Sequence, residues 1–298
     1  MWRIELFGVT TVTTGDGIVS TTDLGGDKPR QIMEILALSA GVPVPKDHLA
    51  ELLWDGHPPP SYLGTLESYV CVLRRTLGLG RGRGATLRTV MRGYLLDPAE
   101  VSVDLLEFRR LLRHSTVGAD PRAALARLEE ALTLVRAELL VGDAYAAWAV
   151  TERETFRREL VEAATLAATH ATTLGEDEDA IRLAHRAIAA DALSEDAWCL
   201  LMGALWRTGR TTEALRAYLA LKGHLSTELG VDPSAGTQDL YLRILRSEGV
   251  DHRQGAHDAC EEVRVLVHLL RQAVASVRGA DALGPDHALV RAVADLVA

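Results

Sequence analysis

Two segments of this 298-residue chain repeat each other at a distance of 34 residues. The string AIRLA begins at Ala180 and ALRAY begins at Ala214, and each opens an alanine-rich stretch. A period of 34 residues is typical of tetratricopeptide arrays, in which small side chains let paired helices approach closely. From Leu105 onward, Ala, Leu, Arg and Glu dominate the sequence. The repeat therefore predicts an all-α tetratricopeptide-like array, which we place at residues 101–250.

Four aromatic side chains recur along this array, and two interpretations of them are open. Such arrays have a concave groove in which a small ligand would fit, and the aromatic side chains would then line it. Aromatic residues at helical spacing more often form the core between helices. The residues concerned are Trp148, Trp198, Trp206 and Tyr218.

The first hundred residues follow a different pattern. Residues 2–24 are rich in Thr, Val and Ile and contain the turn TGDG, which predicts short antiparallel strands. Pro29 and Pro45 mark the starts of two short helices. A third helix is expected over 61–77, because four apolar residues share one face: Leu66, Val70, Leu73 and Leu77. Thr86 to Leu96 alternates as a β-hairpin would, so the order of elements predicts an α+β winged helix in residues 1–100.

A basic window runs from Arg74 to Arg92. It contains six of the chain's 32 basic residues and none of its 41 acidic ones, although the formal net charge is −9. A local positive stripe on an acidic protein favours a polyanionic partner, with double-stranded DNA first. Arg74 and Arg75 would also suit the end of any solvated helix, because cations stabilise the negative end of the helix dipole. The winged-helix order favours DNA over that alternative.

Within this order, four strings resemble a known family: LGGDKPRQIMEILAL, DHLAELLWDGHPPP, TLESYVCVLRRTLG and LRTVMRGYLLDP. They are similar to the N-terminal domain of the Streptomyces antibiotic regulatory proteins, a winged helix of the response-regulator type. The string TELGVDPSAGTQDLYLRIL resembles the bacterial transcriptional activator domain that follows it in that family. The resemblance covers about residues 1–248. Residues 251–298 are then a C-terminal extension, which we expect to be helical and either to cap the array or to mediate self-association.

The resemblance implies a transcriptional activator of an antibiotic or other secondary-metabolite gene cluster. Such a protein would bind direct repeats in promoter DNA, associate with a second copy there and recruit RNA polymerase. The implied DNA-contacting residues are Thr65, Ser68, Tyr69, Cys71, Val72, Arg74, Arg75, Arg88, Arg92 and Tyr94. The implied polymerase-contact loop consists of Asp55, Gly56, His57, Pro58 and Pro59, and a proline-rich turn without a partner is an equally good interpretation of it.

This chain departs from the family pattern on the third helix. Cys71 and Val72 stand where the family often has polar or basic residues. A good bidentate base contact contributes about 1–3 kcal/mol of discrimination. We therefore expect weaker or altered base readout, carried more by Arg75 and the hairpin.

The alternative function is that of a tetratricopeptide-like adaptor that binds other proteins and has a weakened DNA-binding domain. An enzyme is disfavoured, because the chain contains no GxxxxGK[ST] phosphate loop and no hydrolase, zinc-protease or kinase signature. We accordingly expect no catalytic residues and no cofactor.

The cysteine spacing and the hydropathy pattern argue against a metal-binding protein and against a secreted or membrane protein. Cys71 and Cys199 have no metal-type spacing, and the set His252, His257 and Cys260 is too loose to predict a metal site. The N-terminus does not resemble a signal peptide, and no run approaches eighteen uncharged apolar residues. We expect a cytoplasmic, nucleoid-associated protein with no membrane partner.

Overall fold

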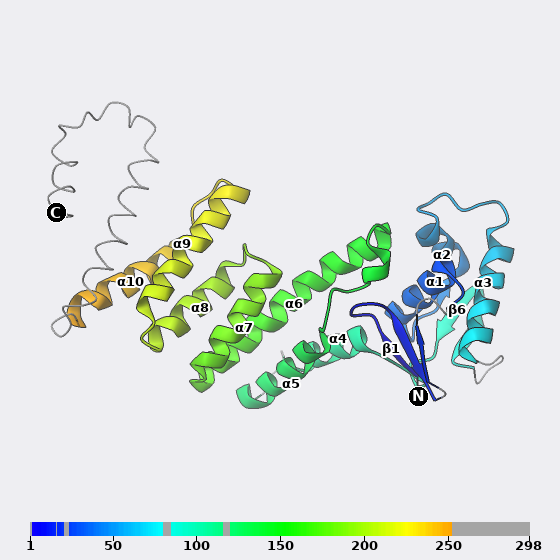
Figure 1. The fold of residues 1–298 in the computed structure, drawn as a ribbon, viewed down its shortest axis with the longest axis horizontal. Coiled ribbons are helices and arrows are strands. Elements are labelled where there is room, and N and C mark those ends of the chain that lie inside the picture. Colours follow the sequence, from blue (N-terminus) through cyan, green and yellow to red (C-terminus); the bar gives the residue numbers. More distant parts are fainter. Residues whose placement is uncertain (1, 16, 21–23, 80–84, 116–119, 252–298) are drawn as a thin grey trace, which may run out of the picture. The chain divides into compact units, whose positions relative to one another are not determined.

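The computed structural model describes residues 2–15, 17–20, 24–79, 85–115 and 120–251 (Figure 1). The chain divides into two compact units, Met1–Tyr241 and Leu242–Ala298, with the boundary inside helix α10 (Ala235–Asp251). The expected C-terminal extension beyond α10, with its His252, His257 and Cys260, lies outside the described residues.

A four-stranded sheet with the strand order β3-β2-β1-β7 opens the fold. Its strands are β1 (Trp2–Glu5), β2 (Thr11–Thr14), β3 (Gly17–Ser20) and β7 (Val101–Val103). The first three strands are antiparallel, as predicted, whereas β7 runs parallel to β1 with Val103 opposite Ile4. Strand β7 was not expected from the sequence, since three residues carry too little alternation. The predicted boundary near residue 100 stays a prediction, because β7 pairs with this sheet and the first array helix follows it directly.

Three helices and a second sheet complete the N-terminal part, and Figure 1 shows the helices grouped around β6. The elements are α1 (Asp27–Leu38), β4 (Val44–Pro45), α2 (Lys46–Leu53), α3 (Tyr62–Leu77), β5 (Leu87–Val90) and β6 (Gly93–Leu96). The second sheet has the order β4-β6-β5, with antiparallel neighbours throughout. Strands β5 and β6 are the predicted hairpin, joined by Met91 and Arg92. The predicted winged helix is confirmed, and this hairpin is its wing.

The rest of the described chain is the predicted helical array. Its helices are α4 (Asp104–Ser115), α5 (Pro121–Leu134), α6 (Ala147–Leu174), α7 (Asp177–Ala190), α8 (Glu195–Arg207), α9 (Thr211–Glu228) and α10. The two repeated strings lie in α7 and α9, where Ala180 and Ala214 are both fully buried. Gly209 adopts a left-handed conformation (φ 75°) in the turn between α8 and α9. The 34-residue period therefore corresponds to one helical pair, as predicted.

Most of the aromatic side chains of the array belong to its core. Trp148, Trp198 and Tyr218 are buried, and Trp206 is half-buried. The indole N–H of Trp198 donates a hydrogen bond to the backbone oxygen of Ala192 at 2.9 Å. Of the two interpretations open from the sequence, the structure favours packing for these residues.

Backbone groups tie the winged helix to the array. Asp104, the first residue of α4, accepts hydrogen bonds from the backbone N–H groups of Leu6 at 2.9 Å and Phe7 at 3.1 Å. The backbone N–H of Leu140 donates to the oxygen of Leu6 at 2.9 Å. The ring of Phe7 lies 4.9 Å from the ring of Phe156 on α6, centroid to centroid. Strand β1 and the residues after it are thus built into both parts of the molecule.

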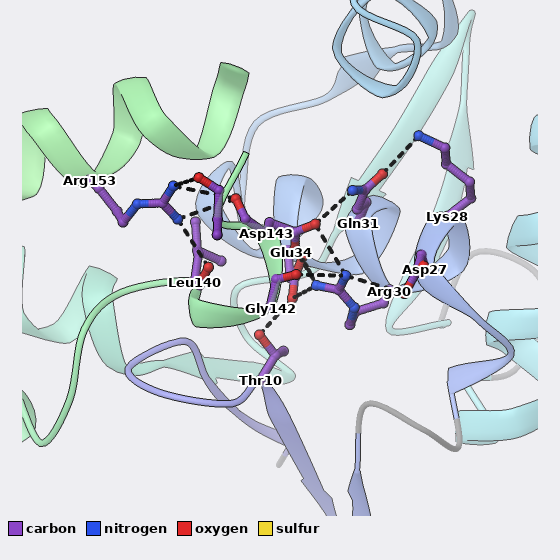
Figure 2. A network of polar contacts seen from close by, with 11 residues as sticks. Thr10, Asp27, Lys28, Arg30, Gln31, Glu34, Leu140, Gly142, Asp143 and Arg153 are labelled. Carbon is purple, nitrogen blue, oxygen red and sulfur yellow. Dashed lines mark hydrogen bonds and ion pairs between the residues drawn. The ribbon is translucent and has the colours of Figure 1, made fainter. Parts of the chain in front are cut away.

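A buried polar cluster forms a second junction, between α1 and the short 3-10 turn η2 (Val141–Asp143). Figure 2 shows contacts from Arg30 of α1 to both Glu34 and Asp143. The guanidinium of Arg30 donates to Glu34 at 3.0 Å and to Asp143 Oδ1 at 3.1 Å. Gln31 donates to Asp143 at 2.6 Å, and the hydroxyl of Thr10 donates to Glu34 at 2.6 Å.

The charge state of this cluster follows from its burial. The side chains of Arg30, Glu34 and Asp143 are 7%, 0% and 2% exposed. Burial raises the pKa of Glu34 to about 8, with a hydrogen bond to Asp143 adding to the shift. Burial alone would raise the pKa of Asp143 too, but hydrogen bonds from Glu34, Arg30 and Gln31 lower it. Near neutral pH the cluster therefore contains one cation, one carboxylate and one neutral carboxyl group, so its net charge is zero.

Candidate nucleic-acid interface

Helix α3 has one buried face and one open face. Its buried residues are Leu66, Val70, Leu73 and Leu77, as the spacing predicted. On the other side, Ser68, Cys71 and Arg75 are exposed and Thr65 and Tyr69 are half-buried. A helix with an open face of this kind suits the DNA major groove, which is wide enough to admit one α-helix.

Arg74 fastens α3 to the wing. Its Nη2 donates to the backbone oxygen of Leu87 at 3.0 Å and to the hydroxyl of Thr89 at 2.9 Å, both on β5. Through these bonds the Arg74 guanidinium holds α3 against β5. Arg74 therefore supports the interface from within.

Arg88 is neutralised by a neighbour. It forms an ion pair and hydrogen bond with Asp97, whose carboxylate also accepts the backbone N–H of Ala99 at 3.1 Å. The Arg88 side chain is 37% exposed and that of Asp97 is 12% exposed. A phosphate would meet this arginine together with its carboxylate, so its net attraction for DNA is small.

Two of the implied contact residues turn inward. Tyr94 is 2% exposed, so its ring belongs to the core and the expectation that it touches DNA is wrong. Val72 is half-buried against the backbone of Gly25, where an added Cβ would lie 2.4 Å from Val72 Cγ1. The sequence pattern places Tyr94 on the hairpin and Val72 on the third helix, but packing in the folded protein decides where their side chains point.

Arg75 and Arg92 are the arginines of the window that remain exposed and without an acidic partner among the residues described. Arg92 lies at the wing tip with φ 66°, in the left-handed region. Its backbone oxygen accepts the N–H of Lys46 at 2.9 Å, which ties the tip to the start of α2. Arg81 and Arg83 lie outside the described residues.

Two features of this surface were not expected from the sequence. Met91, beside Arg92 in the two-residue turn, is 94% exposed. Lys46 Nζ forms a 2.6 Å ion pair with Glu67 of α3 and lies 5.6 Å from the ring centroid of Tyr94. The hydrogen bond with Glu67 raises the pKa of Lys46. The exposure of Met91 could have been predicted from the short hairpin turn. No local sequence pattern predicts the ion pair of Lys46 and Glu67.

The loop between α2 and α3 is a compact turn on the surface. Asp55, Gly56 and His57 are exposed, and Pro58 and Pro59 are half-buried. Asp55 has φ 48° and Gly56 has φ 79°, so the chain reverses through two left-handed residues. The backbone N–H of Gly56 donates to the oxygen of Glu51 at 2.9 Å. The loop therefore presents a defined shape on the surface.

Neither a metal site nor a membrane span is found in the part of the chain that the structure describes. No group of three or more His, Cys, Asp and Glu side chains there is placed to hold a metal ion. Among the same residues, no helix has the length and apolar character needed to cross a bilayer.

Comparisons with known proteins cover both parts of the molecule. A family model described as the bacterial transcriptional activator domain matches residues 103–245. The regulatory protein DnrI of Streptomyces peucetius is 36% identical over 236 residues, which cover 75% of this chain and 86% of that protein. The transcriptional regulator RedD of Streptomyces coelicolor is 31% identical over 248 residues, covering 78% and 69% respectively.

The same fold occurs in a solved structure, Mycobacterium tuberculosis EmbR in complex with a low affinity phosphopeptide. It matches with a TM-score of 0.70 and 25% identity, over 90% of this chain and 71% of that one. The relatives are named as regulators rather than as enzymes. A winged helix followed by the matched activator domain, with this identity to DnrI over most of its length, shows that the chain belongs to the Streptomyces antibiotic regulatory protein family of transcriptional regulators.

Proposed function

We propose that this chain is a DNA-binding transcriptional activator that places α3 in the major groove and the wing tip in the adjacent minor groove. The observation that carries the proposal is a pair of exposed arginines that have no acidic partner in the described part of the chain, Arg75 on α3 and Arg92 on the wing. Arg74 clamps these two elements together, so the two cations are held in one rigid unit. Rigid placement of cations lowers the ordering cost of binding a polyanion.

The open face of α3 sets the kind of sequence readout. Thr65, Ser68 and Cys71 are short side chains, so Arg75 is the long base-reading group among them. Specificity would then rest on Arg75 and on DNA shape at the wing, while phosphate contacts supply most of the affinity.

Titration of DNA at several salt concentrations tests this proposal. The probe is a duplex enriched from a randomised pool by the full chain. Each phosphate neutralised contributes about −0.9 to the slope of log K against log salt. We expect Arg92→Ala to make that slope shallower by about one contact and Arg75→Ala to cost about 1–3 kcal/mol and relax the base preference, whereas Arg127→Ala, on the exposed face of α5, leaves both the slope and the base preference unchanged. Absence of enrichment, or a slope unaffected by Arg92→Ala together with a base preference unaffected by Arg75→Ala, would refute DNA binding through this surface.

DNA binding would be the first step of transcriptional activation. Membership of the family supports activation of an antibiotic or other secondary-metabolite gene cluster, with two copies side by side on promoter direct repeats and recruitment of RNA polymerase. The contact with polymerase would be made by the loop of Asp55 to Pro59, which is exposed and conformationally defined. The protein would act in the cytoplasm, on the nucleoid.

Transcription in vitro separates this step from DNA binding. His57 is exposed, and its ring nitrogen lies 2.9 Å from the backbone oxygen of Asp55. If the loop touches polymerase, His57→Ala will keep the DNA affinity and lower the transcript yield. Equal yields at equal promoter occupancy would exclude this loop as the polymerase contact.

A further inference from the structure

The tip of the wing carries an apolar side chain that is almost fully open to solvent. Met91 is 94% exposed, whereas Met33 and Met202, elsewhere in the described part of the chain, are 1% and 0% exposed. Single exposed apolar side chains are common on protein surfaces, so exposure alone assigns no role to Met91. The conformation of the turn that holds it and the attachment of that turn supply further information.

The turn holds two long side chains where its backbone favours a glycine. Val90 pairs with Gly93, so Met91 and Arg92 are the two central residues of the hairpin turn. Arg92 has φ 66°, and a left-handed residue at the second central position of a turn is usually Gly or Asn. Other residues adopt such a conformation at a cost, and they concentrate where proteins hold ligands. The backbone therefore points to a use for the side chains at this tip.

The tip is supported on both strands of the wing. Gly93 lies so close to β4 that an added Cβ would be 2.3 Å from the backbone oxygen of Val44. The backbone oxygen of Arg92 accepts a hydrogen bond of 2.9 Å from the first residue of α2. Arg74 bonds β5 to α3. An apolar side chain on such a support can be pressed between stacked groups, because the turn beneath it is held in place.

Arg92 determines where Met91 would meet a duplex. A trans peptide bond joins the two residues, so their Cα atoms are about 3.8 Å apart. Successive base pairs of a duplex are separated by about 3.4 Å along its axis, nearly the same distance. With the Arg92 guanidinium in the minor groove, Met91 therefore faces the neighbouring base-pair step. Methionine is among the apolar side chains that minor-groove proteins insert between base pairs.

We propose that Met91 is a wedge that partly unstacks one base-pair step beside Arg92 and thereby kinks the bound duplex. This inference rests on the proposed DNA binding, and it adds a deformation of the DNA and the residue that produces it. The Arg92 cation holds the tip in the groove, while the Met91 side chain covers the base surface that unstacking exposes. Apolar wedges of this kind kink a duplex by roughly 20–90° toward the major groove.

A wedge at this place predicts a sequence preference that needs no hydrogen bond to a base. Pyrimidine–purine steps such as TA and CA/TG unstack easily, whereas A-tracts are stiff. The step beneath Met91 should therefore be selected for its flexibility. The preference should vanish when the wedge is removed, because a step that is not deformed carries no deformation cost.

Energy transfer between dyes at the two ends of the duplex measures the kink. The duplex is the one enriched by the full chain, and a fluorescent adenine analogue placed at successive positions reports which step is unstacked. We expect the unaltered chain to shorten the end-to-end distance and to brighten the analogue at one step. Met91→Ala should abolish most of both changes, and it should leave the slope of log K against log salt unchanged because it removes no cation. Met91→Leu should preserve both changes.

Exchange of the unstacked step tests the sequence preference. Replacing that step by AA should weaken binding of the unaltered chain several-fold, whereas Met91→Ala should bind the two duplexes equally. Tyr145→Ala removes a side chain that is 97% exposed in the turn before α6, and it should behave as the unaltered chain does in every assay. Circular dichroism checks folding, and Met91→Gln, which is polar and of similar length, replaces Met91→Ala if that variant is unfolded.

Two results would overturn the wedge and leave the proposed DNA binding intact. One is a bound duplex that stays straight, and the other is a kink that persists in Met91→Ala; in both cases the salt slope still depends on Arg92. Failure of the full chain to enrich any duplex would overturn the wedge and the proposed DNA binding together. The salt titration and the kink measurement therefore distinguish a failure of one idea from a failure of the other.

Discussion

Replacing Glu34 by Gln should change how stability depends on pH. Glu34 is fully buried beside Arg30 and Asp143, and burial raises its pKa to about 8 from the ordinary 4.5. The carboxyl is therefore protonated below pH 8 in the folded protein, and there it resembles a glutamine side chain in size and charge. In the unfolded chain the same carboxyl is ionised above about pH 4.5.

The expected magnitude follows from this difference. A group whose pKa is raised on folding stabilises the folded state most at low pH, and that contribution is lost as the pH rises through the folded-state value. Between the two pKa values the loss is about 1.4 kcal/mol per pH unit. From pH 6 to pH 8, allowing for partial ionisation near pH 8, Glu34 should lower the free energy of unfolding by about 2 kcal/mol. Gln cannot ionise, so Glu34→Gln removes this loss.

Urea unfolding at pH 6, 7 and 8, followed by circular dichroism, gives the comparison. The quantity of interest is the difference in unfolding free energy between the variant and the unaltered chain, in which the histidines and other common groups cancel. That difference should move by about 2 kcal/mol in favour of the variant between pH 6 and pH 8. Glu154→Gln, at an exposed position of α6, should show no such trend. A pH-independent difference for Glu34→Gln would refute the assignment of a protonated Glu34.

Two further changes test packing at the wing and at the junction of the two parts. Gly93→Ala places a Cβ 2.3 Å from the backbone oxygen of Val44, so it should lower the melting temperature and the DNA affinity. The control is Gly64→Ala on α3, where an added Cβ meets no atom. This control should be neutral or stabilise the fold by about 1 kcal/mol. The Asp104 carboxylate accepts hydrogen bonds from three backbone N–H groups, and Asp104→Asn replaces one of its two acceptor oxygens by an NH₂ group. This change should lower the free energy of unfolding in urea by about 1–3 kcal/mol. Glu107→Gln on the same helix breaks a partly exposed ion pair and should cost under about 1 kcal/mol, and equal costs for the two would contradict this account.

Periodic patterns made most of the architecture predictable. The four-three-four spacing from Leu66 to Leu77 fixed the buried face of α3, and the 34-residue offset from Ala180 to Ala214 fixed the helical pair. Both signals are local repeats of one structural element. By contrast, β7 pairs with β1 across about a hundred residues, and the bond between Arg30 and Asp143 spans 113 positions. Nothing local in the sequence announces such contacts.

The site was predictable in outline but not residue by residue. The basic window coincides with the end of α3 and with the wing, because charge composition is visible in the sequence. Which arginine is free depends on partners in space: Arg74 bonds to β5, Arg88 pairs with Asp97, and Arg92 remains open. The burial of Tyr94 likewise follows from the register of β6 against β4, which the hairpin pattern alone leaves undetermined.

Asp97→Asn should convert Arg88 from a neutralised residue into a DNA contact. In the folded protein the Asp97 carboxylate cancels the charge of Arg88, while one of its oxygens also accepts the backbone N–H of Ala99. Asparagine keeps that acceptor and removes the negative charge, so the wing gains one net cation without losing the turn. We expect the slope of log K against log salt to steepen by about 0.9 and the affinity for duplex DNA to rise most at low salt. Glu154→Gln changes the net charge equally, far from the wing in sequence, and should leave the slope unchanged. If Asp97→Asn is folded and its slope equals that of the unaltered chain, Arg88 does not reach the phosphates, and the DNA surface is limited to α3 and the wing tip.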